Sequence, residues 1–532
     1  MAALLRWFDQ ILNRPRRAAV ALGALAACGF QPLGLWPVGL LAMALFIMLL
    51  ARAQGRRHAA MLGWLFGLGH FTLGNAWIAT AFTYQAKMPG WLGWLAVVGL
   101  ALYLAVYPAL ASLGGWLLGR SSRLALVFAF AASWIVAEWL RGWVFTGFPW
   151  NPFGVVMLGP FDSPGLARLL PWLGTYALSG LAVLLAGALW LGLSRLAESG
   201  QRLRPALVLG VGVALVALVM HLPLGLIRGE GSLPYTLVQP DARQDDLYDP
   251  TKYESQFART AALSLPRRPG ERRVVLWPES GVPDYLREGY PEWFYLQSTY
   301  GGDPLLARRR IGRVAGAESL LLTGADDLEV RRGKVVGARN SVTAIDSEGR
   351  IVASYAKAHL VPYGEYLPMR ELLGPLGLAR LVPGDIDFWP GPGPRTLELR
   401  PWGRIGVQIC YEIVFSGQVI DRAQRPDFLF NPSNDGWFGA SGPPQHLAQA
   451  RLRAIEEGLP VLRATTTGIS AVVDAEGVVR QHVPRLVAGR LDGKVPPAKA
   501  PTLFARLGNM LPLGWAAVLL VAALVASRRR RG

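Results

Sequence analysis

Cysteines and charged residues are both scarce in this chain of 532 residues. Its two cysteines are Cys28, in an apolar stretch, and Cys410, after a strand-like run, which excludes a disulfide framework. Charged residues make up 17% of the chain and hydrophobic residues 52%, which excludes a protein that is soluble throughout. CxxC pairs, HExxH, Walker loops and GxGxxG sequences are also absent. We therefore expect neither a metal site nor a cofactor.

Apolar runs of membrane-spanning length are abundant in the sequence. A helix needs about 20 apolar residues to cross a bilayer. We expect about eight spans, near residues 18–31, 37–51, 59–80, 91–114, 124–141, 170–193, 206–224 and 510–527. The first two are short and share a Pro/Gly turn at residues 31–34. A cleavable signal peptide is not expected, because more spans follow the first.

The net charge of +18 would suit a nucleic-acid partner, but the positions of the charges argue against one. Arginines gather in every second loop, at Arg6, Arg14, Arg16, Arg17, Arg52, Arg56, Arg57, Arg120, Arg123, Arg195, Arg202, Arg204 and 528–531. The alternate short loops hold little more than Lys87 and Arg168, with Arg141 at a span edge. Basic loops of membrane proteins face the cytoplasm. The pattern predicts cytoplasmic termini, residues 228–505 across the membrane, and no nucleic-acid partner.

Composition divides the chain into three parts. Residues 1–227 are expected to form a seven-span bundle, 228–505 a soluble domain, and 506–532 a last span with a basic tail. Strand-like runs of the soluble domain lie at 235–238, 274–277, 319–323, 341–346, 351–356, 396–399, 405–409, 428–431, 461–464 and 470–473, with helical stretches at 251–264, 303–315 and 443–457. Strands that alternate with helices indicate a layered α/β domain.

Three residues of the soluble domain have the chemistry for covalent catalysis. Cys410 ends a strand-like run, Glu279 follows an apolar strand, and Lys357 lies between them in sequence. A thiol needs a base or a nearby cation to become a thiolate, and a carboxylate and an ammonium can supply both. A lone cysteine at a strand end is more often a buried small hydrophobe, so that alternative stays open at this point.

Five short motifs follow one another in this domain and carry a resemblance. They are Trp-Pro-Glu at 277–279, Lys-x-His-Leu-Val-Pro-Tyr-Gly-Glu-Tyr at 357–366, Cys-Tyr-Glu at 410–412, Asn-Asp-x-Trp-Phe at 434–438 and Arg-Ala-Ile-Glu at 453–456. In content and order they resemble the nitrilase superfamily, with its Glu-Lys-Cys triad. With the spans and the Phe-Pro-Trp loop at 148–150, the chain resembles the membrane branch of that superfamily, the apolipoprotein N-acyltransferases, over nearly its whole length. The resemblance implies a multi-pass α-helical membrane bundle plus a nitrilase-like α-β-β-α sandwich domain.

The resemblance also implies a two-step acyl transfer at the bacterial inner membrane, with the soluble domain in the periplasm. Cys410 would take an acyl chain from a membrane phospholipid as a thioester and pass it to the α-amine of a diacylglyceryl-modified apolipoprotein. Glu279 would act as the base, and Lys357 would hold the oxyanion together with a backbone N–H near residue 411. Supporting roles would fall to Glu365, Glu412 and Tyr411, and substrate contacts to Trp437, Phe438, Trp150 and Trp293. We expect a monomer.

Other interpretations stay open. Asp241, Leu459 and Thr466 stand where the family commonly has other residues, although none of them touches the triad. The aromatic loop around Trp150 also fits a plain anchoring belt at the membrane interface. A membrane-tethered amidase would share the triad but would need no apolar entrance. A transporter-like bundle with a degenerate lipoprotein-binding domain would be insensitive to Cys410→Ala, and a glycosyl transferase fusion would need a further catalytic domain.

Overall fold

The computed structural model describes residues 14–84, 89–198, 203–223, 229–368, 371, 375 and 386–528. The chain forms two compact units. The first contains Met1–Ala79, Trp91–Leu224 and Pro501–Gly532, and the second contains Thr80–Gly90 and Gly225–Ala500. The segment 80–90 thus belongs to the second unit, although it lies between helices of the first in sequence. Several charges used for the predicted topology, Arg6, Lys87, Arg202 and 529–531, lie outside the described residues.

The first unit consists of helices joined by short loops. In chain order they are α2 (Pro15–Ala27), α3 (Trp36–Ala51), α4 (Arg56–Gly74), α5 (Ile78–Ala81), α6 (Leu92–Leu104), α7 (Val106–Gly119), α8 (Arg123–Arg141), η2 (Phe153–Met157), η3 (Gly165–Leu169), α9 (Leu170–Glu198), α10 (Leu203–His221), α16 (Leu503–Leu507) and α17 (Met510–Arg528), with α5 reaching into the second unit. A kink at Gly174 interrupts α9.

Five helical stretches are long and apolar enough to cross a membrane. They are Leu92–Gly119, Arg123–Arg141, Gly165–Glu198, Leu203–His221 and Met510–Arg528, while Trp36–Ala51 is apolar but shorter. The two remaining predicted spans correspond to α2, which has 13 residues, and to α4, which begins with two arginines. A total of about eight spans therefore stays a prediction.

Glycines let α2 and α4 pack closely. A Cβ atom at Gly69 would lie 2.0 Å from the carbonyl oxygen of Val20, and one at Gly23 would lie 1.9 Å from that of Phe66. Small residues at such crossings allow helix backbones to approach where water supplies no hydrophobic driving force. Any larger side chain at these two positions would push the helices apart.

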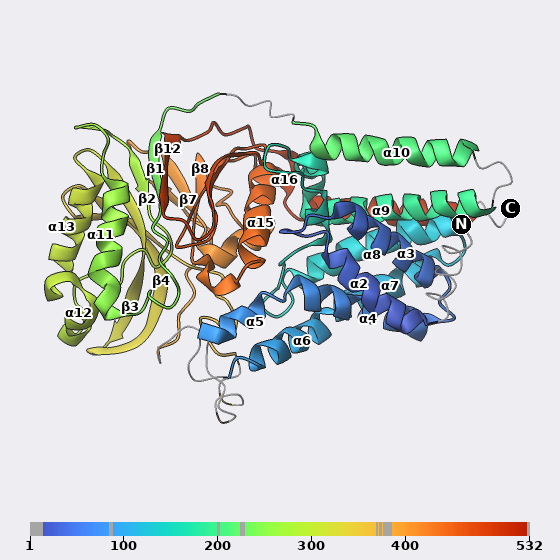
Figure 1. The fold of residues 1–532 in the computed structure, drawn as a ribbon, viewed down its shortest axis with the longest axis horizontal. Coiled ribbons are helices and arrows are strands. Elements are labelled where there is room, and N and C mark those ends of the chain that lie inside the picture. Colours follow the sequence, from blue (N-terminus) through green and yellow to red (C-terminus); the bar gives the residue numbers. More distant parts are fainter. Residues whose placement is uncertain are drawn as a thin grey trace. The chain divides into compact units, whose positions relative to one another are not determined.

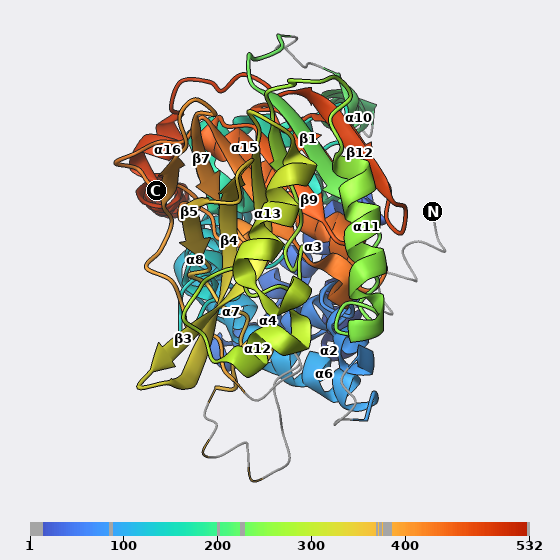
Figure 2. The ribbon, with the colours of Figure 1, turned by 90° about the vertical axis from the view of Figure 1, so that its left-hand side faces the viewer.

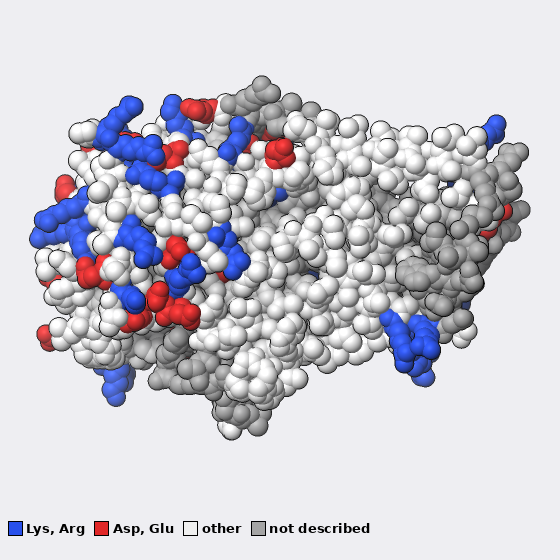
Figure 3. Space-filling view, viewed as in Figure 1, with Lys and Arg blue, Asp and Glu red and all other residues white. Residues whose placement is uncertain are grey.

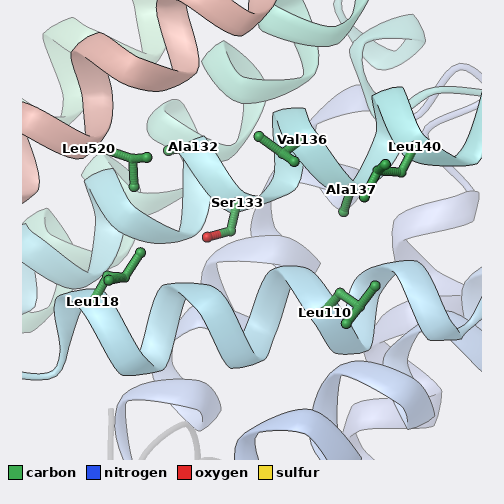
Figure 4. Close-up of a pocket in the computed structure, with 8 residues that line it drawn as sticks. All are labelled: Leu110, Leu118, Ala132, Ser133, Val136, Ala137, Leu140 and Leu520. Carbon is green, nitrogen blue, oxygen red and sulfur yellow. The ribbon is translucent and has the colours of Figure 1, made fainter.

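The outer helices of the first unit expose apolar side chains. On α10 the buried set contains Met220 alone, and Figure 3 shows a surface over α10 that is almost free of charge. An apolar cavity of about 190 Å³ lies between α7, α8 and α17 (Figure 4). Its lining consists of Leu110, Leu118, Ala132, Ser133, Val136, Ala137, Leu140 and Leu520. Such surfaces suit contact with lipid rather than water.

The second unit is built on two six-stranded sheets. The first has the order β12-β1-β2-β3-β4-β5, and the second has the order β11-β10-β9-β8-β7-β6. Their strands are β1 (Pro234–Gln239), β2 (Val274–Leu276), β3 (Leu320–Arg331), β4 (Lys334–Asp346), β5 (Ile351–Ala356), β6 (Thr396–Glu398), β7 (Arg404–Val407), β8 (Phe428–Ser433), β9 (Val461–Thr465), β10 (Ser470–Val473), β11 (Val479–Val483) and β12 (Gly489–Lys494). Each sheet has a parallel centre, β1-β2-β3 or β7-β8-β9, flanked by antiparallel strands.

Helices cover the outer faces of both sheets. Figures 1 and 2 show α11 (Tyr253–Ser264), α12 (Glu292–Ser298) and α13 (Pro304–Ala315) over the first sheet, and Figure 1 shows α15 (Gly442–Glu457) beside the second. Apolar side chains such as Val275, Trp277 and Leu321 from the first sheet pack with Ile311 of α13 in one buried core. The order of layers is the predicted α-β-β-α sandwich.

Polar contacts join the inner faces of the two sheets. The side-chain oxygen of Gln239 on β1 accepts hydrogen bonds from Thr465 Oγ1 at 2.8 Å and from the backbone N–H of Ser470 at 2.9 Å. All three residues are fully buried, so the bonds hold the sheets in one register. Each of the ten predicted strand positions carries a strand, whereas β11, β12 and α12 were not predicted.

Candidate active site

Three candidate residues come from the ends of three different strands. Glu279 follows β2, Lys357 directly follows β5, and Cys410 comes three residues after β7. The structure brings them together: Lys357 Nζ lies 3.4 Å from Glu279 Oε1, and both charges act on the Cys410 thiol. Each side chain belongs to a residue that is at most 6% exposed. The hydrogen-bonded cluster is therefore largely shielded from water.

Cys410 does not end a strand, as its sequence position suggested. It begins the 3-10 helix η7 (Cys410–Val414) and has a backbone φ of +50°. This left-handed conformation costs a residue other than glycine about 1–2 kcal/mol. The carboxylate of Glu412 stabilises the turn, because its Oε2 accepts the backbone N–H of Ile409 at 2.7 Å. The sheet alone therefore does not set the direction of the thiol.

Lys357 is held by two carboxylates. Its Nζ donates to Glu365 Oε1 at 2.9 Å as well as to Glu279 Oε1. Burial by itself would lower the pKa of Lys357, but the negative charges of Glu365 and Glu279 raise it above its ordinary value. The second oxygen of Glu365 accepts the backbone N–H of Val361 at 2.8 Å. Lys357 is thus a fixed cation over the whole physiological pH range.

Asn340 on β4 is a member of the cluster that sequence reasoning missed. Its Nδ2 donates to Glu279 Oε1 at 2.7 Å and to Glu365 Oε1 at 3.0 Å, and its carbonyl oxygen accepts the N–H of Lys357 at 2.9 Å. The pairing of β4 with β5 places it beside the lysine. No local motif marks this residue, because its role depends on the strand register. The other oxygen of Glu279 accepts the backbone N–H of Asn434 at 2.7 Å.

The thiol of Cys410 needs help to ionise. Burial raises its pKa well above the ordinary value, the negative charge of Glu279 raises it further, and Lys357 opposes both effects. Burial and the charge of Glu279 thus both favour the protonated form of the thiol. Ionisation requires that the proton leave for a neighbouring base, and Glu279 is the carboxylate whose charge acts most strongly on the thiol.

Glu412 connects the lysine loop to the cysteine turn. Its Oε1 accepts from the Tyr355 hydroxyl at 2.8 Å and from the N–H of Ala358 at 2.7 Å, next to Lys357. Burial raises the pKa of Glu412 to about 7. Tyr411 is buried beside this turn and packs its ring edge-on against Phe415, with centroids 5.1 Å apart.

The predicted substrate-contact residues lie in different places. Trp437 and Phe438 belong to η8 (Asp435–Phe438), which begins one residue after Asn434 and so adjoins the cluster. Trp293 is 53% exposed on α12 and stacks on Phe294. Trp150 is fully buried in the first unit, where its ring centroid lies 4.7 Å from that of Trp77. The hydrogen-bonded cluster thus includes neither Trp293 nor Trp150. Within the part of the chain that the structure describes, no group of three or more His, Cys, Asp or Glu side chains could hold a metal ion.

Comparison with known proteins matches both parts of the chain. Residues 22–188 match the apolipoprotein N-acyltransferase N-terminal domain, and residues 256–490 match the carbon-nitrogen hydrolase domain. The apolipoprotein N-acyltransferase of Rhodopseudomonas palustris is 35% identical, with 97% of this chain and 96% of that protein covered. The proteins of the same name from Bradyrhizobium diazoefficiens and Azotobacter vinelandii are each 34% identical, with 97% and 99% of this chain and 95% and 97% of those proteins covered.

Among solved structures, an amidase from Nesterenkonia sp. is 19% identical, with 53% of this chain and 95% of that chain covered and a TM-score of 0.35. The five long apolar helices, together with the relatives named above, identify a bacterial membrane protein. Because the identity extends over nearly the full length of both partners, the chain belongs to the apolipoprotein N-acyltransferase family.

Proposed function

We propose that this protein moves an acyl chain from a membrane phospholipid to the α-amine of the N-terminal diacylglyceryl-cysteine of apolipoproteins. The acyl chain travels as a thioester on Cys410. The observation that carries the proposal is a buried thiol on which the carboxylate of Glu279 and the ammonium of Lys357 act more strongly than any other charge, in a chain of this family. The first half-reaction acylates the enzyme, and the second regenerates it.

In the first half-reaction the Cys410 sulfur attacks the ester carbonyl of the phospholipid. Glu279 takes the thiol proton and later delivers it to the departing alkoxide, so that a lysophospholipid leaves and a thioester remains. The negative charge that develops on the carbonyl oxygen is stabilised by the ammonium of Lys357 and by the backbone N–H of Tyr411. Because Lys357 is already held by two carboxylates, it needs little rearrangement to act.

In the second half-reaction the free amine of the lipoprotein attacks the thioester. Glu279 accepts a proton from the attacking nitrogen as the C–N bond forms, and it passes that proton to the sulfur as the C–S bond breaks, which restores the thiol. Glu365 and Glu412 act by fixing Lys357 and the cysteine turn. Tyr411 supplies its backbone N–H, and its buried ring supports the turn.

Transfer to an amine must also outcompete hydrolysis of the thioester. A pocket that admits the amine but excludes bulk water achieves this. Trp437 and Phe438 adjoin the cluster and are proposed to line such a pocket. Trp293 and Trp150 are proposed as further substrate contacts. Each buried methylene of the acyl chain contributes about 0.8 kcal/mol, which favours long chains drawn from a bilayer.

The membrane arrangement follows from the same proposal. Eight spans, with 1–227 and 506–532 in the bacterial inner membrane, would leave residues 228–505 in the periplasm and both termini in the cytoplasm. A monomer that anchors its catalytic domain at both ends keeps that domain close to its lipid donor. Fusion of an enzyme that is active only in the periplasm at residue 532 would test the orientation, because an active fusion would contradict it.

The decisive experiment is a search for the acyl-enzyme. The purified protein is incubated with phospholipid vesicles without acceptor and its intact mass is measured, with Cys28→Ala as the matched control for the other thiol. We expect an increase by one fatty acyl group in the wild type and in Cys28→Ala. Cys410→Ala should show no adduct and an unchanged thermal midpoint. Adduct formation by Cys410→Ala, or hydrolysis of small amides without any lipid adduct, would contradict the proposal.

A further inference from the structure

A buried histidine contacts the backbone of the candidate nucleophile. His446 on α15 places its Nε2 3.0 Å from the carbonyl oxygen of Cys410. A carbonyl oxygen only accepts hydrogen bonds, so Nε2 must carry a hydrogen for this contact to be favourable. His446 is fully buried and packs against Phe438, whose ring centroid lies 5.6 Å away. The mechanism derived above makes no use of this residue.

Two charged side chains fix the orientation of the His446 ring. Its Nδ1 lies 3.0 Å from Asp435 Oδ1 and 3.0 Å from Arg463 Nη2, and Arg463 in turn donates to both oxygens of Asp435 at 2.7 Å. Burial lowers the pKa of His446, and the positive charge of Arg463 lowers it further. A neutral ring with its hydrogen on Nε2 can accept from Arg463 at Nδ1 and donate to Cys410. Arg463 thus supports the tautomer that the Cys410 carbonyl requires, and Asp435 contributes by accepting hydrogen bonds from Arg463 at both of its oxygens.

Such a buried set of charges is weak evidence of a stabilising role. Removing charges from water is costly, and apolar residues of similar volume often give equal or higher stability. Asp435, His446 and Arg463 are each at most 2% exposed, so this cost applies to all of them. A functional benefit would account for keeping the set beside the nucleophile.

Because the peptide bond is planar, the hydrogen bond from His446 to the Cys410 carbonyl also affects the neighbouring N–H. The carbonyl of Cys410 and the N–H of Tyr411 belong to one planar trans peptide unit, so they point in opposite directions. Fixing the direction of the carbonyl therefore fixes the direction of the N–H. This control matters at Cys410, because its φ of +50° is a conformation from which the backbone would otherwise relax.

We infer that His446 is a positioning residue that aims the N–H of Tyr411 at the oxyanion, by holding the carbonyl of Cys410 on the opposite side of the same peptide unit. The inference rests on the proposed function, since it assigns His446 to the oxyanion site of that reaction. Asp435 and Arg463 act through His446 by setting its ring and its tautomer.

The arrangement links the base to the oxyanion site. Asn434 donates its backbone N–H to Glu279, and the next residue, Asp435, fixes Arg463, whose Nη2 contacts His446 Nδ1. One short stretch of chain after β8 therefore positions both the group that takes the proton and the group that directs the N–H. Movement of this stretch would disturb both halves of the chemistry together.

The test compares two amides at position 446. The amide nitrogen of His446→Gln lies where Nε2 lies in histidine, whereas that of His446→Asn lies where Nδ1 lies. Single-turnover formation of the Cys410 acyl-enzyme is measured by intact mass at several phospholipid concentrations. A disturbed oxyanion donor costs about 10²-fold in the maximal rate. We expect that loss in His446→Asn, with an unchanged half-saturating lipid concentration and substantial recovery in His446→Gln.

Alkylation of Cys410 by iodoacetamide provides the control, because displacement of iodide develops no oxyanion. Cys28→Ala serves as the background in every variant, so that only Cys410 reacts. Unchanged alkylation in His446→Asn, alongside the lost acylation, would support the inference. Equal losses in both variants, or parallel changes in alkylation and acylation, would assign His446 to the fold and overturn the inference. If either of these results overturned the inference while Cys28→Ala still formed the acyl adduct on Cys410, the proposed function would be unaffected.

Discussion

Each of the two units buries a glutamate near a cationic side chain, and the side chains of the two units are equally shielded from water. Glu138 and Glu279 are both 6% exposed, and Arg141 and Lys357 are both 2% exposed. In the first unit, Glu138 Oε1 accepts from the indole of Trp134 at 3.0 Å and from the N–H of Phe153 at 2.7 Å. Burial of charge therefore does not by itself distinguish a structural set of charges from one proposed to be catalytic.

The partners of the two pairs make the difference. Arg141 donates to the carbonyl oxygens of Phe148 and Trp150, each at 2.8 Å, so its charge ties the loop after α8 to that helix. Lys357 instead bonds two carboxylates, and its charge acts on a thiol. The first pair uses its charge on backbone groups and the second directs it at a reactive atom. The comparison predicts that equal substitutions in the two pairs will have different consequences.

The largest difference is expected between Glu279→Gln and Glu138→Gln. A positioned general base contributes about 10²–10⁴-fold, so Glu279→Gln should lower the rate of acyl-enzyme formation by such a factor. Glu138→Gln should lower the thermal midpoint and leave the rate near that of the wild type. Intact mass in single-turnover time courses measures the rate, and thermal unfolding in detergent measures the stability. Similar rates of acyl-enzyme formation in the two variants would contradict the different roles assigned to Glu279 and Glu138.

A second contrast lies between Lys357→Met and Arg141→Met. Removing Lys357 leaves two buried carboxylates without their cation, which costs about 3–5 kcal/mol. Removing Arg141 takes the donor from the carbonyl oxygens of Phe148 and Trp150, so that variant should also lose stability. Only Lys357→Met should also lose about 10²–10³-fold in acylation, because it removes an oxyanion donor. Both rates are measured below the lower of the two thermal midpoints. An Arg141→Met enzyme that is folded yet equally slow would contradict the structural assignment of that arginine.

Glu412 gives the second unit a dependence of stability on pH. Its folded pKa of about 7 lies above the ordinary value of 4.5, so the folded state binds a proton more tightly than the unfolded state. Its contribution to the free energy of unfolding is complete below pH 4.5 and is lost as pH rises through 7. The loss amounts to about 3 kcal/mol.

Glu412→Gln should flatten the fall in stability between pH 4.5 and 7, as followed by denaturant unfolding. The flattening is partial, because Glu457 has a pKa of about 7 from burial and adds to the same window. Glu457→Gln is the matched control far from the cysteine turn in sequence. An unchanged slope in Glu412→Gln would contradict the assigned pKa.

The smallest effect on stability is expected at Trp293. Because its side chain is half exposed, Trp293→Ala should change the free energy of unfolding by less than about 0.5 kcal/mol. If it contacts the lipid or the lipoprotein, as proposed, the half-saturating substrate concentration should rise while the maximal rate stays constant. Titration of vesicles and of a lipopeptide acceptor separates the two substrates. If Trp293→Ala had the half-saturating concentrations of the wild type for both substrates, Trp293 would not contact either of them.

The strands of the second unit and its cluster of candidate residues could be predicted for different reasons. Buried strands such as β2 and the start of β3 form continuous apolar runs, which the sequence displays directly. The edge strands β11 and β12 were missed, because Val479–Val483 and Gly489–Lys494 carry polar residues and glycine in place of such runs. Glu279, Lys357 and Cys410 were recognisable because each lies in a short motif.

Asn340 and His446 could not be predicted in their roles. Asn340 reaches the cluster through the pairing of β4 with β5, and His446 reaches it from α15, 36 residues after Cys410 in sequence. The expected strand end at Cys410 was wrong for a related reason. The hydrogen bonds of Glu412 and His446 favour a tight turn over continued extension.

Sequence alone determined the apolar helices, the alternating α/β pattern and the choice of a thiol, a carboxylate and an ammonium as candidate site residues. These properties are local, because residue type and spacing set hydropathy, periodicity and reactivity. The tertiary structure decided which polar groups meet around the thiol, the direction of the Cys410 peptide and the separation of structural from reactive buried charges. Each of these depends on strand register and on contacts between distant segments, which side-chain chemistry does not specify until the sheets have packed.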